Sequence, residues 1–291
     1  MEILQLTIAG VAIGCIYALI ALGFVLIYKA TEVVNFAQGD VMMLGGFVAF
    51  TFAVLWEFPF WLAVIFAILV LALVGAVFNR VLLVPIIGQP TFAAVMITLA
   101  AGYVMRGVAS MVPGWGTDTY ALKAPYSDGT LRLGELVVST DHIAIIVLTA
   151  LLCLGLFLFF KYTRVGIAMQ ASSQNQLAAN YMGIPVRRIN TLIWGISAGV
   201  AAFTAILLAP ITFVHTNMGF IGLKAFPAAV VGGFGSIPGA IAGGLIIGLV
   251  ESYAGFYLPE GFKDVAAYVV VLLVLMIRPS GIFAEMRRKK V

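Results

Sequence analysis

The sequence predicts an all-α polytopic membrane protein with about eight membrane segments. Three observations predict this class: 63% of the 291 residues are hydrophobic, only 10% are charged, and the mean hydropathy is +1.13. A soluble domain carries about 25% charged residues. Apolar runs follow one another along the whole chain, so we expect residues 1–291 to form a single transmembrane domain.

The apolar runs give the expected membrane segments in chain order. A bilayer-spanning helix needs about 20 mostly apolar residues, and most of the runs fit one crossing each. The run at 225–257 is too long for one comfortable crossing and too short for two. The runs lie at 4–28, 36–55, 60–84, 91–112, 142–160, 191–213, 225–257 and 265–277.

The run at 225–257 contains a predicted break. Its first 26 residues carry no charge and include seven glycines. Pro238 lacks a backbone donor, and the glycines around it weaken helix propagation. Breaks at membrane depth survive only where protein or a water-filled cavity surrounds them, and in transporters they often mark the substrate path. For Gly243, Gly244 and Gly248, close helix packing is an equally good interpretation.

The loop charges predict which side of the membrane each loop faces. The loop at 161–190 carries four basic residues and no acid, and the C-terminal tail carries four more basic residues. Both are cytoplasmic under the positive-inside rule, which leaves the more acidic loop at 113–141 outside. If each of the other seven runs crosses once, these assignments hold only when the run at 225–257 enters and leaves the membrane on the same side. The Met1 end is then outside and the C-terminus cytoplasmic.

A few charged side chains fall at membrane depth, where they are costly and indicate function or pairing. Asp40 either pairs or acts in function, and the sequence leaves both open. Arg106 and Glu251 either pair with each other or end at the interface. Three further cations lie near segment ends, where we expect them to snorkel to the headgroups: Lys29, Arg80 and Lys224.

The loop at 161–190 predicts a short amphipathic helix over 167–182, uninterrupted by Pro or Gly. Gly183 fits a helix stop, with Pro185 two residues beyond it. The helix has almost no charge, which favours docking in a shallow groove of a partner protein over lying on the membrane surface. Its apolar side consists of Ile167, Ala171, Leu177, Ala178 and Tyr181.

Known catalytic and nucleotide-binding motifs are missing from the sequence. There is no G-x-x-x-x-G-K-[ST] loop, nucleophile elbow or H-E-x-x-H. Cys15 and Cys153 are isolated in apolar runs and form neither a disulfide framework nor a metal site. We therefore expect no cofactor, no metal, no catalysis by this chain and no nucleic-acid partner. A transport subunit that uses energy from another protein fits. The alternatives are an ion-driven carrier, with Asp40 and Glu251 as candidate carboxylates, and a passive channel for urea or an amide.

Three separated motifs resemble branched-chain amino-acid ABC transporter permeases of the LivH/LivM type, and LivH more closely. The first is Y-A-L-I-A-L-G at 17–23 with V-V-N-F-A-Q-G-D at 33–40. The second is the cytoplasmic loop with Thr163-Arg164, Ala179 and Met182-Gly183-Ile184. The third runs from G-L-K-A-F at 222–226 through G-G-F-G-S-I-P-G-A at 232–240. The resemblance covers essentially the full length.

The resemblance implies a bacterial inner-membrane importer in which two permease subunits, usually a heterodimer, form the pathway. Two cytoplasmic ATP-binding subunits supply the energy, and a periplasmic solute-binding protein delivers the substrate. Branched-chain amino acids head the substrate classes, and related systems serve other amino acids, urea, short amides and carboxylates.

The resemblance also implies roles for residues of two segments. The first set would line or gate the path: Asn35, Phe36, Gln38, Gly39, Asp40, Gly232, Gly233, Gly235, Ser236, Pro238 and Gly239. The second set would couple to the ATPases: Gly166, Ala168, Ala171, Leu177, Ala178, Tyr181, Met182 and Gly183. Related loops often have an arginine near Gln170 and an acid near Gln174. This chain has neither, so the resemblance does not imply charge pairing with the ATPase at those points.

Overall fold

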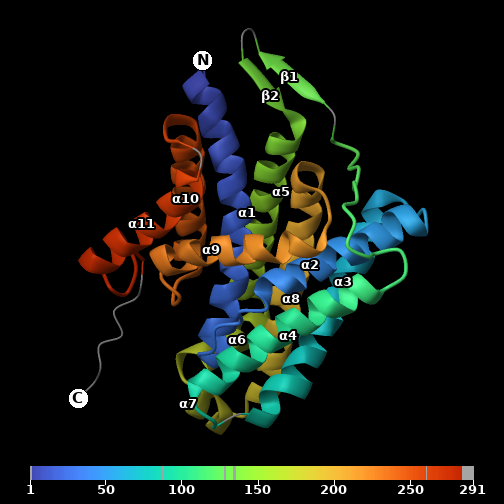
Figure 1. Cartoon of the computed structure of the whole chain (residues 1–291). Coiled ribbons are helices and arrows are strands. Elements are labelled where there is room, and N and C mark those ends of the chain that lie inside the picture. The colour runs from blue at the N-terminus through green and yellow to red at the C-terminus, as the bar shows by residue number, and fades with distance from the viewer. Residues whose placement is uncertain (1, 87, 128, 134–135, 260, 284–291) are drawn as a thin grey trace.

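The computed structural model describes residues 2–86, 88–127, 129–133, 136–259 and 261–283, and most of these residues are helical (Figure 1). The chain order is α1 (Glu2–Thr31), α2 (Gln38–Phe50), η1 (Thr51–Leu55), α3 (Phe60–Phe78), η2 (Asn79–Leu83), η3 (Val84–Ile86), α4 (Thr91–Met111), β1 (Thr130–Leu133), β2 (Leu136–Ser139), α5 (Thr140–Tyr162), α6 (Arg164–Gln174), α7 (Gln176–Tyr181), α8 (Val186–Thr212), η4 (Thr216–Met218), α9 (Gly219–Gly232), α10 (Ile237–Tyr257) and α11 (Phe262–Ile277). The strands β1 and β2 form an antiparallel hairpin.

The predicted class, an all-α polytopic membrane protein, is confirmed. Within the described residues, seven helical segments are long and apolar enough to cross a membrane. The helices α9 and α11 are shorter, with 14 and 16 residues. At about 1.5 Å per residue, α11 is several ångströms shorter than a hydrocarbon core of about 30 Å. The predicted segment at 265–277 is therefore a short helix.

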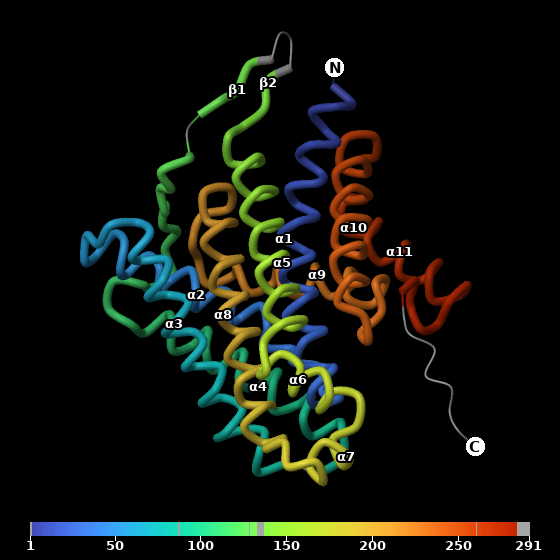
Figure 2. Tube along the Cα trace, turned by 180° about the vertical axis from the view of Figure 1, so that it is seen from behind, coloured from blue at the N-terminus to red at the C-terminus, as the bar shows by residue number. Residues whose placement is uncertain are grey.

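The helices α1 and α8 form the centre of the molecule. In the most apolar windows of these two helices, 89% and 83% of the residues are buried, against 22% for α4 and 17% for α5. A helix that is apolar all round and buried all round is a core helix, whereas α4 and α5 present most of their surface to lipid or to other subunits. Most other helices pack directly on α1 or α8, whereas α4 packs on α2, and α11 packs on α9 and α10 (Figures 1 and 2).

Small residues bring α1 and α10 into close contact. A Cβ atom on Gly244 would overlap Ala18, and one on Gly248 would overlap the backbone of Gly14. A third close contact joins α10 to α9, where Gly243 packs against the carbonyl of Ala228. Such close backbone approach is typical of helix pairs in membranes, where dispersion contacts replace the hydrophobic effect as the driving force. For these three glycines the packing interpretation is correct.

The predicted break is confirmed. The helix α9 ends at Gly232 and α10 begins at Ile237. In Figures 1 and 2, α9 lies across the middle of the molecule, and α10 runs beside α1 back toward the end that holds the N-terminus and the hairpin. This arrangement agrees with a segment that enters and returns on one side. Pro238 lies in the first turn of α10 rather than in the break itself, because the first helical turn needs no donor there.

The single helix predicted over 167–182 is wrong, since two helices, α6 and α7, occupy this segment. Asn175 separates them with extended φ and ψ of −156° and 103°. Its side chain accepts a hydrogen bond of 3.0 Å from the N–H of Ala178 and so caps α7. Asparagine competes with helix by bonding to nearby backbone, which explains the interruption without a Gly or Pro.

The predicted stop at Gly183 is confirmed by a φ of +82°. The N–H groups of Gly183 and Ile184 donate to the carbonyls of Asn180 and Ala179, at 3.0 Å each. These two hydrogen bonds form a Schellman motif, which ends α7. The helices α6 and α7 lie at the opposite end of the molecule from the N-terminus and the hairpin (Figures 1 and 2).

Candidate functional site

The turn between α1 and α2 is held by a buried polar network. The N–H of Ala37 donates to Oδ1 of Asn35 at 3.1 Å, and Nδ2 of Asn35 donates to Oε1 of Gln38 at 3.2 Å. On α8, Ser197 lies against Gln38 and donates to the carbonyl of Gly23 at 3.0 Å. Asn35 and Gln38 are each only 1% exposed. In this structure these two predicted path residues fix the turn against α1 and α8, because buried polar groups need such partners.

Asp40 pairs with Arg106 of α4. The carboxylate of Asp40 accepts a charge-assisted bond from Nε of Arg106, and the guanidinium carbon lies 3.9 Å from the centroid of the Phe220 ring. A Cβ atom on Gly102 or Gly219 would overlap the Asp40 carboxylate. The glycines thus make room for the pair between α2, α4 and α9. Both charges are mostly buried, so each depends on the other for compensation.

The remaining intramembrane carboxylate, Glu251, does not pair with Arg106. Glu251 is 5% exposed, and its Oε1 lies 3.8 Å from Nζ of Lys263 in α11. The two carboxylates thus belong to separate ion pairs. Among the described residues, no three His, Cys, Asp or Glu side chains gather into a possible metal site.

The helix α9 connects the α1–α2 turn to the break. Gly39 packs backbone to backbone against Gly222. The ring of Phe226 lies 5.5 Å from that of Phe36 and 5.6 Å from that of Phe234, measured between centroids. Phe234, in the break, also lies 5.0 Å from Tyr28 of α1. The structure therefore brings the two segments that the resemblance assigned to the path into one aromatic layer, although about 200 residues separate them in the chain.

Several backbone groups of the break form hydrogen bonds within the protein. Gly233 has a φ of +92°, and its N–H donates to the carbonyl of Ala229 at 3.0 Å. Ser236 caps α10 by accepting a bond of 3.0 Å from the N–H of Gly239. Gly232 and Gly239 face each other so closely that a Cβ atom on either would overlap the other's backbone. Gly235 is exposed, with no atom within 4 Å of where its Cβ atom would lie.

A segment after α11 bonds to the end of α9, and this contact was not predicted from the sequence. The N–H of Ile282 donates to the carbonyl of Val231 at 2.9 Å, and the N–H of Phe283 donates to the carbonyl of Gly232 at 3.2 Å. Gly281, at φ +89°, packs on the backbone of Gly233. We name residues 281–283 the C-terminal clasp. The residues Pro279-Ser280-Gly281 are typical of a turn, but no local pattern indicates that this turn contacts α9.

The predicted coupling residues have different surroundings. Gly166 is buried against the backbone of Phe159 and Phe160 in α5, and Ala168 and Ala171 are half-buried. The other residues are exposed, and three of them are large and apolar. This exposed set consists of Leu177 at 71%, Ala178, Tyr181 at 87%, Met182 at 83% and Gly183.

Residues 6–278 match the family described as branched-chain amino acid transport system / permease component. The chain belongs to this family. It is 32% identical to the high-affinity branched-chain amino acid transport system permease protein BraD of Pseudomonas aeruginosa, over 99% of this chain and 98% of that protein. It is 32% identical to LivH of Escherichia coli K12, over 99% and 97%. It is 31% identical to a probable LivH of Methanocaldococcus jannaschii, over 91% and 87%.

The buried ion pair of this permease-family chain yields a stability prediction. Replacing Asp40 with Asn leaves the Arg106 guanidinium without a counter-charge, which we expect to cost about 3–5 kcal/mol. Thermal denaturation of the purified protein measures this loss. The matched control is Lys224→Gln, which breaks the exposed pair with Asp264 and should cost at most about 1 kcal/mol. Equal effects of the two substitutions would show that the buried pair has no special role.

The C-terminal clasp yields a second prediction. In Gly281→Ala the new methyl group would overlap the backbone of Gly233 and strain a positive φ. We expect destabilisation and faster proteolysis in the break. Gly261→Ala is the matched control, because Gly261 has a φ of +93° but no atom within 4 Å of its Cβ position. The Gly261→Ala variant should be destabilised by the backbone strain alone, about 1 kcal/mol. The clasp assignment fails if both variants show the same proteolysis in the break.

Proposed function

We propose that the chain is the permease subunit of an ABC importer for branched-chain or related amino acids. The observation that carries the proposal is the family match, which covers nearly the full length at 31–32% identity to three permease proteins named for branched-chain amino acid transport. In the proposed complex, a second permease subunit completes the pathway. Two cytoplasmic ATP-binding subunits supply energy, and a periplasmic solute-binding protein delivers the substrate. The C-terminus is cytoplasmic and the membrane is the bacterial inner membrane.

The exposed patch on α7 supports the docking of an ATPase. Leu177, Tyr181 and Met182 are large apolar side chains at an extramembrane end of the molecule, and each is at least 71% exposed. Contiguous exposed apolar surface of this kind is typical of protein interfaces. The patch lies on the basic, cytoplasmic loop. Gln176 ties the helix to the rest of the chain, since its Nε2 donates to the carbonyl of Ala30 at 2.6 Å.

For the path, we propose a division of roles among the residues that the sequence singled out. Asn35, Gln38 and Asp40 hold the α1–α2 turn in place, and Phe36 contacts α9 through Phe226. Gly235 in the break is exposed, and so is Pro238 in the first turn of α10. During alternating access, a shift of α6 against the end of α1 would change the position of the break, and the pathway would open to one side and then the other.

The ion pairs disfavour an ion-driven carrier. Such a carrier needs a carboxylate that binds and releases a cation or proton. Asp40 is held by Arg106, and Glu251 lies beside Lys263. The passive channel stays as the second alternative, and it would require neither ATP nor a binding protein.

The test of this proposal uses coupled transport. We expect Ala178→Arg to place a charge in the apolar patch, so that ATP-driven uptake falls at least tenfold while the protein still folds. The reason is that an unpaired buried charge in an interface costs several kcal/mol. Uptake of labelled leucine and ATP hydrolysis are measured in proteoliposomes with the whole complex. Asn180→Arg adds the same charge on the same helix beside the patch and should have a smaller effect. Unchanged coupled uptake in Ala178→Arg would contradict the docking assignment.

A further inference from the structure

A cavity of about 650 Å³ lies between the predicted coupling segment and the break. It is bounded by the last turns of α1, the end of α5, one side of α6, Ile193 of α8, and Gly235 and Ile237 at the break. Cavities of about 300–1,000 Å³ hold small ligands in proteins. Gly235, which the resemblance assigns to the path, lines one end of this space, and the other lining residues belong to neither the path set nor the coupling set.

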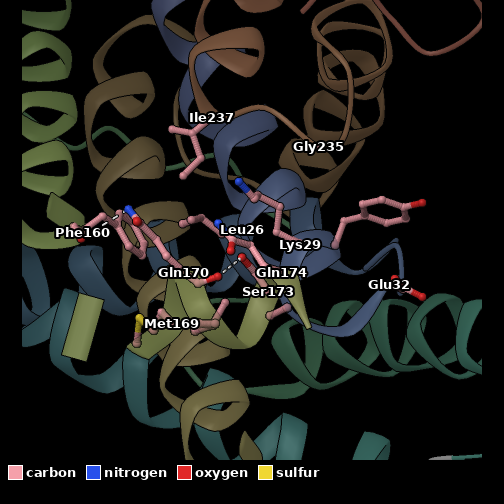
Figure 3. A pocket seen from close by; sticks show the side chains of 13 residues that line it. Leu26, Lys29, Glu32, Phe160, Met169, Gln170, Ser173, Gln174, Gly235 and Ile237 are labelled. Atoms are coloured by element: carbon pink, nitrogen blue, oxygen red, sulfur yellow. Dashed lines mark hydrogen bonds between the residues drawn. The ribbon is translucent and has the colours of Figure 1, made fainter. Parts of the chain in front are cut away.

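One charged group projects into the cavity. Figure 3 shows the Lys29 side chain and the Gln174 side chain reaching into the same space, with Glu32 at the rim and its carboxylate turned away. The ammonium group of Lys29 takes part in none of the ion pairs or hydrogen bonds found among the described residues. The sequence predicted that Lys29 snorkels to lipid headgroups, but the structure directs it into a protein cavity. A half-buried cation without a partner favours binding of an anion.

The other lining residues restrict the chemistry of that anion. Gln170, Ser173 and Gln174 of α6 supply polar atoms, and the remaining wall includes Leu26, Met169, Ile193 and Ile237. One cation matches one carboxylate and is too little for a di- or triphosphate, which recruits several basic groups. The apolar wall matches a short aliphatic chain. Small amino acids with an apolar side chain combine these features.

The position of the cavity gives such a ligand an effect on transport. A molecule bound there would touch α6 and, at the same time, Gly235 and Ile237 of the break. If the two conformations of alternating access differ in the distance between α6 and the break, the ligand binds one of them more tightly. It then shifts the equilibrium toward that conformation.

We infer that this cavity is a cytoplasmic binding site for a small apolar amino acid, through which accumulated product slows further import. The inference rests on the proposed function for the orientation of the chain and the class of substrate. Lys29 would bind the carboxylate, and Leu26, Met169 and Ile193 would contact the side chain.

The experiment measures inhibition from the cytoplasmic side. Proteoliposomes contain the whole complex, with ATP and unlabelled leucine inside, and labelled leucine with the binding protein outside. Internal leucine should lower the initial uptake rate. Lys29→Gln should raise the half-inhibitory concentration roughly tenfold to a hundredfold, the range expected for loss of a charge-assisted hydrogen bond. Each variant is compared with its own uptake without internal leucine.

Two further variants keep the result specific. Gln174→Ala should raise the half-inhibitory concentration by a smaller factor, because it removes an amide and leaves the cation. Arg80→Gln is the matched control, since Arg80 is an exposed cation outside the cavity, and it should leave the inhibition unchanged. An equal shift in Arg80→Gln would overturn the site.

The remaining outcomes separate this inference from the proposed function. Robust uptake that internal leucine does not slow would overturn the inference and leave the proposed function intact. If uptake fails altogether, binding of labelled leucine to the purified complex without the binding protein decides, because only an intact Lys29 site should bind it. Binding is also compared in vesicles with and without phosphatidylglycerol. If Lys29→Gln loses binding of the anionic lipid rather than of leucine, the ligand is a lipid headgroup and the inference is overturned.

Discussion

The constraint on which the structure depends is that an interrupted helix inside a membrane must find partners for its free backbone groups within the protein. The break between α9 and α10 meets this constraint in three ways. Gly233 turns back onto α9, Ser236 caps α10, and the C-terminal clasp donates to the carbonyls of Val231 and Gly232. The last of these links the end of the described chain to the break. The position of α11 follows, because its C-terminal end must bring residues 281–283 to the break.

A second consequence of the break is the orientation of α9, which lies across the molecule between α2 and α10. Contact of this kind requires small residues at the crossings, and Gly39, Gly222, Gly232 and Gly239 supply them. The ion pair of Asp40 lies at one end of α9 and the aromatic layer around Phe226 lies toward the other. Rigid contacts on both sides mean that a displacement of the α1–α2 turn would be transmitted to the break rather than absorbed by loose packing.

The features that the sequence predicted correctly depend on local patterns. The membrane segments follow from runs of apolar residues, the break from the glycines around Pro238, and the end of α7 from Gly183. The interruption at Asn175 was missed because an asparagine cap is a weak signal inside an alanine-rich helix. The partners of Asp40 and Gly233 and the cavity that Lys29 enters could not be predicted, since each is formed by segments that are distant in the chain. The roles of the path residues stay predictions.

The central claim is that the break borders the route of the substrate and changes with the ATP cycle. Gly235 is suited to test it, because a side chain there meets no atom within 4 Å and its φ is not in the left-handed region. The measurement is the rate at which a membrane-impermeant thiol reagent modifies Gly235→Cys, in a chain whose Cys15 and Cys153 are replaced by Ala. The account predicts modification from the cytoplasmic side at a rate that differs several-fold between the nucleotide-free complex and the complex trapped during ATP hydrolysis. Equal rates in both states, or no modification in either, would contradict it.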